Sequence, residues 1–222
     1  MSGTLSVVAT PIGNLEDITL RALRILKEAA YVLCEDTRVT GKLLKQYDIG
    51  TKLRRYDAHA SERTHEAILE DLRAGKHIAL VSDAGTPGVS DPGVLLVARA
   101  REAGARIDAI PGPSAVTAAF SIAGIPGNNF VFLGFVPQKK GRQTFFNTLG
   151  DYEMPIVCYE APHRILKTLE SLASLAPMPQ VTIGRELTKL HEEVVTGTAA
   201  EVRAYFEAHP DHVRGEFVVI VH

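Results

Sequence analysis

The stretch 78–93 limits the possible folds of this chain more than any other part of its sequence. It begins with a short apolar run, 78–81, which predicts a buried strand, and continues as a loop rich in Gly, Pro, Ser and Asp. Asp91 suits a helix N-cap and Pro92 a first helical position, so a helix is expected from Val94. A strand, a small-residue loop and a helix in succession form the ligand crevice of many α/β sheets, although a plain chain turn is the alternative.

Strand-like and helix-like stretches alternate through the first half of the chain, which favours an α/β fold with a mostly parallel sheet covered on both faces. Helices are expected after a cap at Asp17, with apolar Leu23, Leu26 and Ala30, and after a cap at Ser61. The predicted strands are 5–10, 31–34, 53–56, 78–81 and 106–110.

A second α/β lobe is predicted after the Gly- and Pro-containing stretch 125–129, the best linker candidate in the chain. Thr198 and Glu201 form a capping-box pattern for one of its helices. Its predicted strands are 130–133, 156–159, 181–184, 194–195 and 217–221. The sequence therefore predicts two lobes, 1–124 and 125–222, with a cleft between them.

Composition excludes several classes of protein. The 222 residues carry 24 basic and 26 acidic side chains, a formal charge of -2, so any contact with nucleic acid must come from a local basic patch. Cys34 and Cys158 lie far apart in apolar segments and are expected to be buried thiols. The sequence starts on a strand pattern without a signal peptide and has no apolar run of about 20 residues, so a cytoplasmic protein without membrane contact is expected.

Standard catalytic and phosphate-binding motifs are missing. The chain has no Gly-x-Gly-x-x-Gly, no Gly-x-x-x-x-Gly-Lys-[Ser/Thr] and no Gly-x-Ser-x-Gly. Their absence disfavours dinucleotide-binding oxidoreductases, P-loop enzymes and hydrolases with a nucleophile elbow. His209 and His212 are three residues apart but lack neighbouring ligands, so no metal site is predicted. Polar and small residues are concentrated instead at the predicted strand ends, which suits a ligand that is part apolar ring, part polyol and part zwitterion.

Six motifs together resemble the ribosomal RNA small subunit methyltransferase I group of the tetrapyrrole methylase superfamily. They are 9–19 (ATPIGNLEDIT), 35–38 (EDTR), 81–93, 111–115 (PGPSA), 159–164 (YEAPHR) and 184–189 (GRELTK). The resemblance implies S-adenosylmethionine as methyl donor, bound in a cleft between two α/β lobes, and a homodimer. The implied substrate is small-subunit ribosomal RNA or the small ribosomal subunit, and the implied product is a 2′-O-methylated cytidine.

The resemblance also assigns residues to the cofactor. Ser82-Asp83-Ala84 stands where relatives carry Gly-Asp-Pro, and a predicted helix N-terminus at Ser114 favours the carboxylate of the ligand. Members of the group commonly carry a further small helical segment after the strand that matches 217–221. RNA contacts made by that segment are expected to be missing from this chain. The expected cofactor residues are Pro11, Ser82, Asp83, Ala84, Gly85, Thr86, Ser114, Ala115, Tyr159, Leu187 and Gly215.

Candidates for a general base are Asp36, Glu160, Glu186 and Lys189, which follow predicted strands. The alternative is that Glu160 and Glu186 are structural partners of Arg164 and Arg185. Phe135 and Tyr56 are expected either to stack on bases or to belong to the core. RNA contacts are expected from two basic runs, or these runs are solvated surface: Arg38, Lys42, Lys45, Lys52, Arg54 and Arg55 in the first lobe, and Lys139, Lys140 and Arg142 in the second.

Two other functions remain open at the level of the sequence. One is a methylase of the same fold acting on a corrin, a porphyrin or a protein side chain. The other is a non-catalytic module that binds a nucleotide or adenosylmethionine as a signal.

Overall fold

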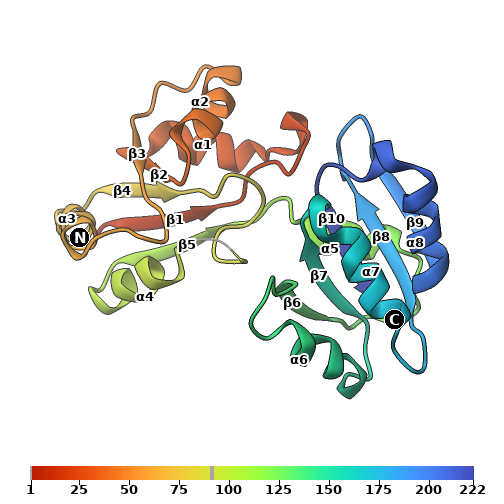
Figure 1. The fold of residues 1–222 in the computed structure, drawn as a ribbon. Coiled ribbons are helices and arrows are strands. Elements are labelled where there is room, and N and C mark those ends of the chain that lie inside the picture. The colour runs from red at the N-terminus through yellow and green to blue at the C-terminus, as the bar shows by residue number, and fades with distance from the viewer. Residues whose placement is uncertain (1, 91–92) are drawn as a thin grey trace. The chain divides into compact units, whose positions relative to one another are not determined.

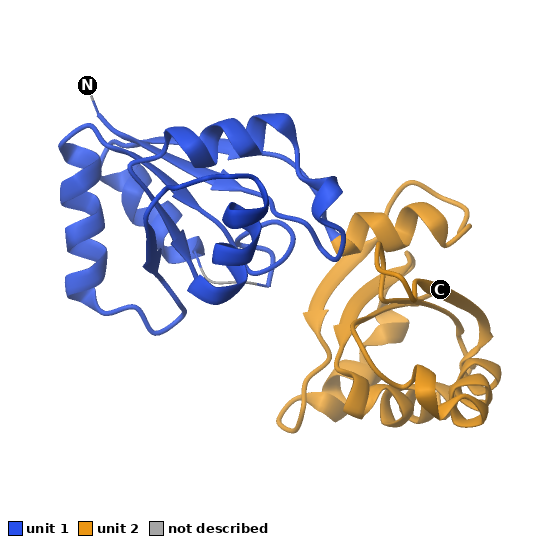
Figure 2. Ribbon diagram, turned by 90° about the horizontal axis from the view of Figure 1, so that it is seen from above, with its two compact units in different colours: residues 1–114 blue, residues 115–222 orange. Residues whose placement is uncertain are grey.

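The structure, a computed structural model, describes residues 2–90 and 93–222 and contains two compact units, Met1–Ser114 and Ala115–His222 (Figures 1 and 2). The predicted cap at Asp91 and helix start at Pro92 lie outside the described residues. The units divide earlier than the predicted boundary after Gly124, because helix α5 (Ala115–Ile122) contacts strands β7 and β10 of the second unit.

The first unit contains a five-stranded sheet in the order β3-β2-β4-β1-β5, and every pair of neighbours in it is parallel. The predicted parallel sheet is thus confirmed, with its strands within two residues of the expected bounds. The strands are β1 (Thr4–Val8), β2 (Tyr31–Cys34), β3 (Leu53–Arg55), β4 (His77–Leu80) and β5 (Arg106–Ile110).

Helices cover both faces of this sheet, as predicted (Figure 1). Helices α1 (Leu20–Glu28) and α2 (Thr37–Gln46) pack on one face, where Leu26 and Leu44 join a buried cluster. Helices α3 (Glu62–Arg73) and α4 (Val94–Glu102) pack on the other face, where a separate cluster forms. Burial of these apolar side chains on both sides stabilises the sheet by roughly 1.5–3 kcal/mol for each large aliphatic group.

Two helix starts in the first unit differ from the prediction. The cap of α1 is Thr19, whose hydroxyl accepts from the Ala22 N–H, whereas Asp17 ends a short 3-10 turn. Helix α2 was not predicted, and Asp36 caps it by accepting from the Arg38 N–H. Ser61 caps α3 as expected, accepting from the Thr64 N–H.

The second unit contains another five-stranded sheet, in the order β6-β7-β10-β8-β9. Only β6 and β7 are parallel, and β10 runs antiparallel to both of its neighbours. The start of β10 therefore lies beside the ends of β7 and β8, and Phe217 pairs with both Glu160 and Arg185. The strands are β6 (Val131–Phe135), β7 (Ile156–Glu160), β8 (Gln180–Arg185), β9 (Glu193–Thr198) and β10 (Phe217–Val221).

Helices α6 (Arg142–Asn147), α7 (Ile165–Ala173) and α8 (Ala199–Ala208) pack on one face of the second sheet around Phe206. Helix α5 packs on the other face. The predicted capping box of α8 is present. Short 3-10 turns span Leu15–Asp17, Leu149–Asp151, Pro162–Arg164 and Pro210–His212. Among the described residues, no helix is long and apolar enough to span a membrane.

Candidate functional site

Three strand-end loops of the first unit are tied together at the carboxyl edge of its sheet. They follow β1, β4 and β5, which are neighbours in the sheet. Thr10 and Gly85 exchange two backbone hydrogen bonds, with N···O distances of 2.9 and 3.0 Å. The Thr86 hydroxyl donates to the Pro113 carbonyl at 3.2 Å. The predicted cofactor residues 82–86, Pro11 and Ser114 therefore gather at one edge, on or beside these three loops.

The backbone favours glycine where these loops meet. Gly85 has a φ of +77°, which residues with a side chain rarely adopt, whereas a Cβ there would make only ordinary contacts, 3.4 Å from Ile12 Cγ2 and 3.8 Å from the Pro113 oxygen. The Ser82 side chain is buried and donates to the Ala84 and Gly85 carbonyls, at 3.1 and 3.3 Å. Ser82 thus stabilises the loop from within, whereas Asp83 and Ala84 are exposed at its rim.

The exposed carboxylate of Asp83 connects this loop to the one that follows β2. Its Oδ1 accepts from the Asp36 N–H at 3.1 Å. The Asp36 carboxylate in turn pairs with the Arg38 guanidinium, with 2.6 Å between Oδ2 and Nη2. Hydrogen bonds from the Arg38 side chain and backbone hold the pKa of Asp36 well below its usual range. Asp36 is consequently charged at neutral pH and engaged as a helix cap and ion-pair partner.

In the second unit, Tyr159, Leu187 and Gly215 also lie along one edge of the sheet. This happens because β10 is antiparallel to β7 and β8, and not because all strands run in one direction. Gly215 has a φ of +87°, and a Cβ there would lie 2.3 Å from Glu186 Oε1, so a larger residue would strain the backbone and displace the Glu186 side chain. The Tyr159 ring packs on Phe132 and Phe135, with centroid distances of 5.0 and 5.2 Å.

Glu186 and Lys189 form an ion pair at this edge. Glu186 Oε1 accepts from Lys189 Nζ at 2.8 Å and from the Glu216 N–H at 2.9 Å. Burial by itself raises the pKa of Glu186, but these two hydrogen bonds outweigh it and the pKa is lowered. Burial opposes the charge of Lys189, yet its bonds to Glu186 and Glu216 raise its pKa. Both groups are therefore charged at neutral pH.

Glu160 lies at the base of the same edge and is buried. Its carboxylate accepts from the Ala161 N–H at 2.7 Å and from the Thr168 hydroxyl at 2.5 Å. It pairs with Arg164 at 2.6 Å and lies 3.7 Å from Arg142. These contacts support the structural alternative for Glu160. They also occupy Arg142, whose side chain is only 12% exposed, so the structure turns this predicted RNA contact inward.

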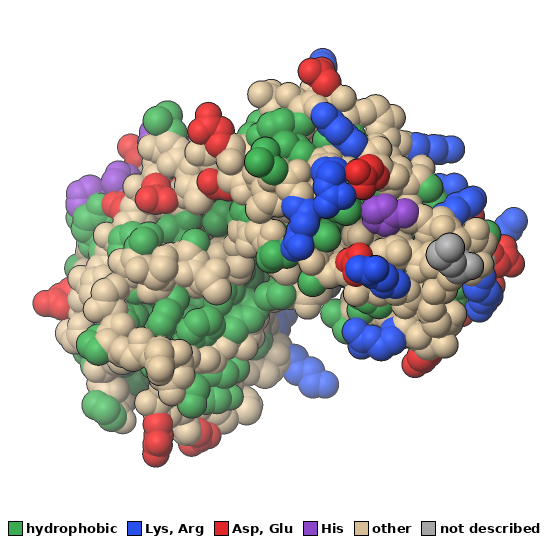
Figure 3. All heavy atoms as spheres, turned by 180° about the vertical axis from the view of Figure 1, so that it is seen from behind, with side chains coloured by type: hydrophobic (Ala, Val, Ile, Leu, Met, Phe, Trp, Pro, Cys, Tyr) green, Lys and Arg blue, Asp and Glu red, His purple; other side chains and the backbone are tan. Residues whose placement is uncertain are grey.

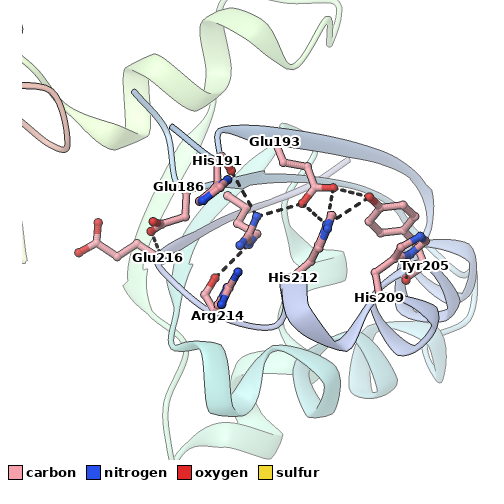
Figure 4. Close-up of polar contacts among 9 residues, drawn as sticks. Glu186, His191, Glu193, Tyr205, His209, His212, Arg214 and Glu216 are labelled. Atoms are coloured by element: carbon pink, nitrogen blue, oxygen red, sulfur yellow. Dashed lines mark hydrogen bonds and ion pairs between the residues drawn. The ribbon is translucent and has the colours of Figure 1, made fainter. Parts of the chain in front are cut away.

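A polar network beside this edge was missed by sequence reasoning (Figure 4). Arg185 is buried and pairs with Glu193 at 3.3 Å, not with Glu186 as the structural alternative supposed. Glu193 also accepts from the Tyr205 hydroxyl, and its carboxylate lies 3.0 Å from His212 Nδ1. The four side chains come from β8, β9, α8 and the turn after it. The spacing of these four residues in sequence therefore does not predict the network.

The remaining predicted residues divide between surface and core. Arg38, Lys42, Lys139 and Lys140 are exposed. Tyr56 is buried, with its hydroxyl 3.0 Å from His65 Nε2, so it belongs to the core. Phe135 is 56% exposed and remains available for stacking.

Figure 3 shows one face of the molecule, with Lys and Arg side chains spread over the first unit and hydrophobic ones over the second. Cys34 and Cys158 are buried free thiols, as predicted, and burial raises the pKa of Cys158 to about 12. Within the described residues, no group of three or more His, Cys, Asp or Glu could hold a metal ion.

Comparison with known proteins shows the family to which this chain belongs. The family model described as "Tetrapyrrole (Corrin/Porphyrin) Methylases" matches residues 4–203, and the chain belongs to this family of methyltransferases. Two relatives are both named ribosomal RNA small subunit methyltransferase I. One, from Neisseria meningitidis serogroup B, is 45% identical over 100% of this chain and 77% of the relative. The other, from Thermotoga maritima, is 43% identical over 92% of each.

Solved structures of this fold agree with the predicted fold class. A diphthine synthase aligns with a TM-score of 0.74 at 15% identity, covering 99% of this chain and 89% of its own. A cobalt precorrin-4 methyltransferase of cobalamin biosynthesis aligns with a TM-score of 0.73 at 18% identity, covering 98% and 94%. At this identity they show the fold alone. The predicted α/β fold of the tetrapyrrole methylases is confirmed.

Proposed function

We propose that the protein transfers a methyl group from S-adenosylmethionine to the 2′-hydroxyl of a cytidine in small-subunit ribosomal RNA. The observation that carries this proposal is the similarity, over essentially the full chain, to relatives named ribosomal RNA small subunit methyltransferase I. The six motifs quoted above support it, because they lie at or beside the strand-end loops that the structure gathers in each unit.

The loops of the first unit fit such a donor. The backbone at Gly85 carries no side chain beside Ile12 and Pro113, and Asp83 offers an exposed carboxylate to a cation or to hydroxyl groups. Pro11, Ala84 and Thr86 would complete this part, and Ser114 with Ala115 stands at the start of α5. In the second unit Tyr159, Leu187 and Gly215 are the proposed contacts. When bound, S-adenosylmethionine supplies an electrophilic methyl group on a sulfonium.

The chain's own contribution is positioning rather than strong base catalysis. Asp36 and Glu186 are acids with lowered pKa values, and Lys189 is a base with a raised one. A general base is most effective when its pKa lies near the working pH, and none of these three pKa values is shifted toward pH 7. Holding an acceptor hydroxyl in line with the methyl group can supply much of the acceleration. We propose that the residues at the rims of the strand-end loops contribute in this way.

A methylase acting on a corrin or porphyrin ring is the second candidate, favoured by the shared fold and by the description of the family. The basic residues on the surface of the first unit favour RNA instead. Arg38 and Lys42 lie on α2, directly after the strand-end loop that contains Asp36.

The test is to incubate the protein with labelled S-adenosylmethionine and small ribosomal subunits that lack the modification, and then to map the labelled nucleotide. We expect a single 2′-O-methylated cytidine and no label on free uroporphyrinogen. Label on the tetrapyrrole alone would contradict the proposal. Calorimetry with S-adenosylmethionine and with ATP distinguishes a methyl-donor site from a nucleotide sensor.

We also propose that the protein assembles as a homodimer, on the basis of the family resemblance. Sedimentation velocity at micromolar concentration should give a mass near twice the 24.1 kDa of one chain. A single species at 24.1 kDa across the concentration range would contradict this part of the proposal.

A further inference from the structure

A cleft in the first unit lies between the edge strand β3 and the first turns of α3. Its volume is about 300 Å³. Its polar lining comes from Arg54, Arg55, Arg63, Ser61 and Thr64, over an apolar floor that includes Leu33. Guanidinium and hydroxyl groups around one cleft are donors suited to an anion, and a guanidinium binds phosphate oxygens in a bidentate manner.

An aromatic ring and a carboxylate hold Arg54 at this cleft. Its guanidinium lies over the Tyr31 ring, 3.6 Å from the ring centroid, and its Nη1 is 3.0 Å from Asp71 Oδ2. Asp71 also accepts from the Tyr31 hydroxyl at 2.9 Å and pairs with Lys76 at 2.5 Å. The Arg54 side chain is nevertheless 41% exposed, so an ordered cation faces solvent.

The acidic groups around the cleft are already paired. Glu62 pairs with Arg99, and Asp57 lies 3.0 Å from Arg55. Arg63 is exposed and makes no ion pair within residues 2–90 and 93–222. Asp71 balances only one of Arg54 and Lys76. The cleft consequently carries a net positive charge that no side chain of the described residues neutralises.

The cleft lies near the same sheet edge as the proposed donor loops. Strand β3 neighbours β2, and β2 neighbours β4, whose loop contains Asp83. Two strand spacings amount to about 10 Å. The charges of one strand are spaced about 3.4 Å apart along the axis of a duplex, and successive phosphates lie farther apart than this through space, so at most about three nucleotides cover this distance. Arg38 follows β2, the strand between β3 and β4, at the start of α2.

We propose that this cleft binds a backbone phosphate of the RNA strand whose target nucleotide reaches the loop 82–86. This inference rests on the proposed function and names part of its substrate site. A phosphate of a strand is favoured over a free nucleotide because none of the described residues that line the cleft is aromatic, so nothing there would stack on a base.

The test compares Arg63→Gln with Arg73→Gln, which removes the same charge from the other end of α3. Binding of the unmodified small subunit is measured at several salt concentrations. We expect Arg63→Gln to weaken binding about tenfold near 0.1 M salt and to lower the log–log salt slope by about 0.7–0.9. Arg63→Lys should retain the slope, and Arg73→Gln should match the wild type. Calorimetry should give the same S-adenosylmethionine affinity for all four proteins.

Two failures are distinguishable. If Arg63→Gln and Arg73→Gln bind RNA with the same affinity and salt slope, the phosphate cleft is refuted while methylation by the wild type still supports the proposed function. If the wild type neither binds nor methylates the small subunit, the proposed function fails and this site fails with it.

Discussion

Asp83 is the residue on which the first unit's candidate site most depends, because its exposed carboxylate links two strand-end loops through the Asp36 N–H. We predict that Asp83→Arg abolishes S-adenosylmethionine binding without unfolding the protein, since it places a cation beside Arg38 and removes the acceptor. Calorimetry measures the binding, and circular dichroism checks the fold.

Asp83→Asn is the matched control, because its amide oxygen still accepts from the Asp36 N–H while the charge is lost. It should fold normally and bind more tightly than Asp83→Arg. Unchanged binding by the Asp83→Arg variant would show that the loop rim does not contact the donor.

The candidate bases predict a simple pH dependence of turnover. Asp36 and Glu186 have pKa values lowered below their ordinary values of 3.8 and 4.5, so both stay deprotonated above about pH 5. Lys189 has a raised pKa and stays protonated at neutral pH. We expect kcat measured on small subunits to be flat between pH 5.5 and 8. An acidic limb near pH 7 would point to a base outside this set.

At the level of single elements, the network around Glu193 joins β8, β9 and α8. Burial alone raises the pKa of Glu193, but hydrogen bonds from Tyr205 and His212 outweigh it and lower the pKa below 4.5. A carboxylate with a lowered folded-state pKa contributes stability above pH 4.5, and this contribution is lost as the pH falls through the folded-state value.

We predict that Glu193→Gln lowers the free energy of unfolding by about 1.5–3 kcal/mol at pH 7. The difference from the wild type should shrink as the pH drops below 4.5. Urea titrations at pH 7, 5 and 3.5 measure it. A difference that stays constant with pH would mean that the charge of Glu193 contributes nothing.

The first sheet could be predicted from sequence because each of its strands carries its own local signal. The apolar runs at 31–34 and 78–81 lie within two residues of the observed strands. Helix α2 escaped prediction although Asp36 is a good cap and Thr40, Leu43 and Leu44 share one face, because the motif at its start was read as a loop only.

Strand direction in the second sheet could not be predicted, since apolar runs do not encode whether neighbours are parallel. The candidate residues at its edge were predicted from the family resemblance and not from their spacing in sequence. The partners of Arg185 and Arg142 depend on tertiary packing, which brings Glu193 and Glu160 to them from other elements.

At the scale of the whole molecule, the two units have separate cores. Phe206 and its buried neighbours all lie in the second unit, and the two clusters of the first unit share no residue with them. Each unit therefore has its own source of hydrophobic stabilisation.

We predict that Phe206→Ala costs about 3–5 kcal/mol and that the loss is confined to the second unit. Hydrogen exchange should show weaker protection of β7 and β10, with β1 and β4 unchanged. Equal loss of protection in both units would instead indicate one cooperative core.

The central position of β10 has a consequence for synthesis on the ribosome. Its partners β7 and β8 leave the exit tunnel earlier, and each has an unpaired edge until residues 217–221 follow. The nascent second unit therefore holds open strand edges until residue 221 has emerged, whereas the first unit already has all five of its strands. Chaperone binding to stalled nascent chains should accordingly concentrate on this half.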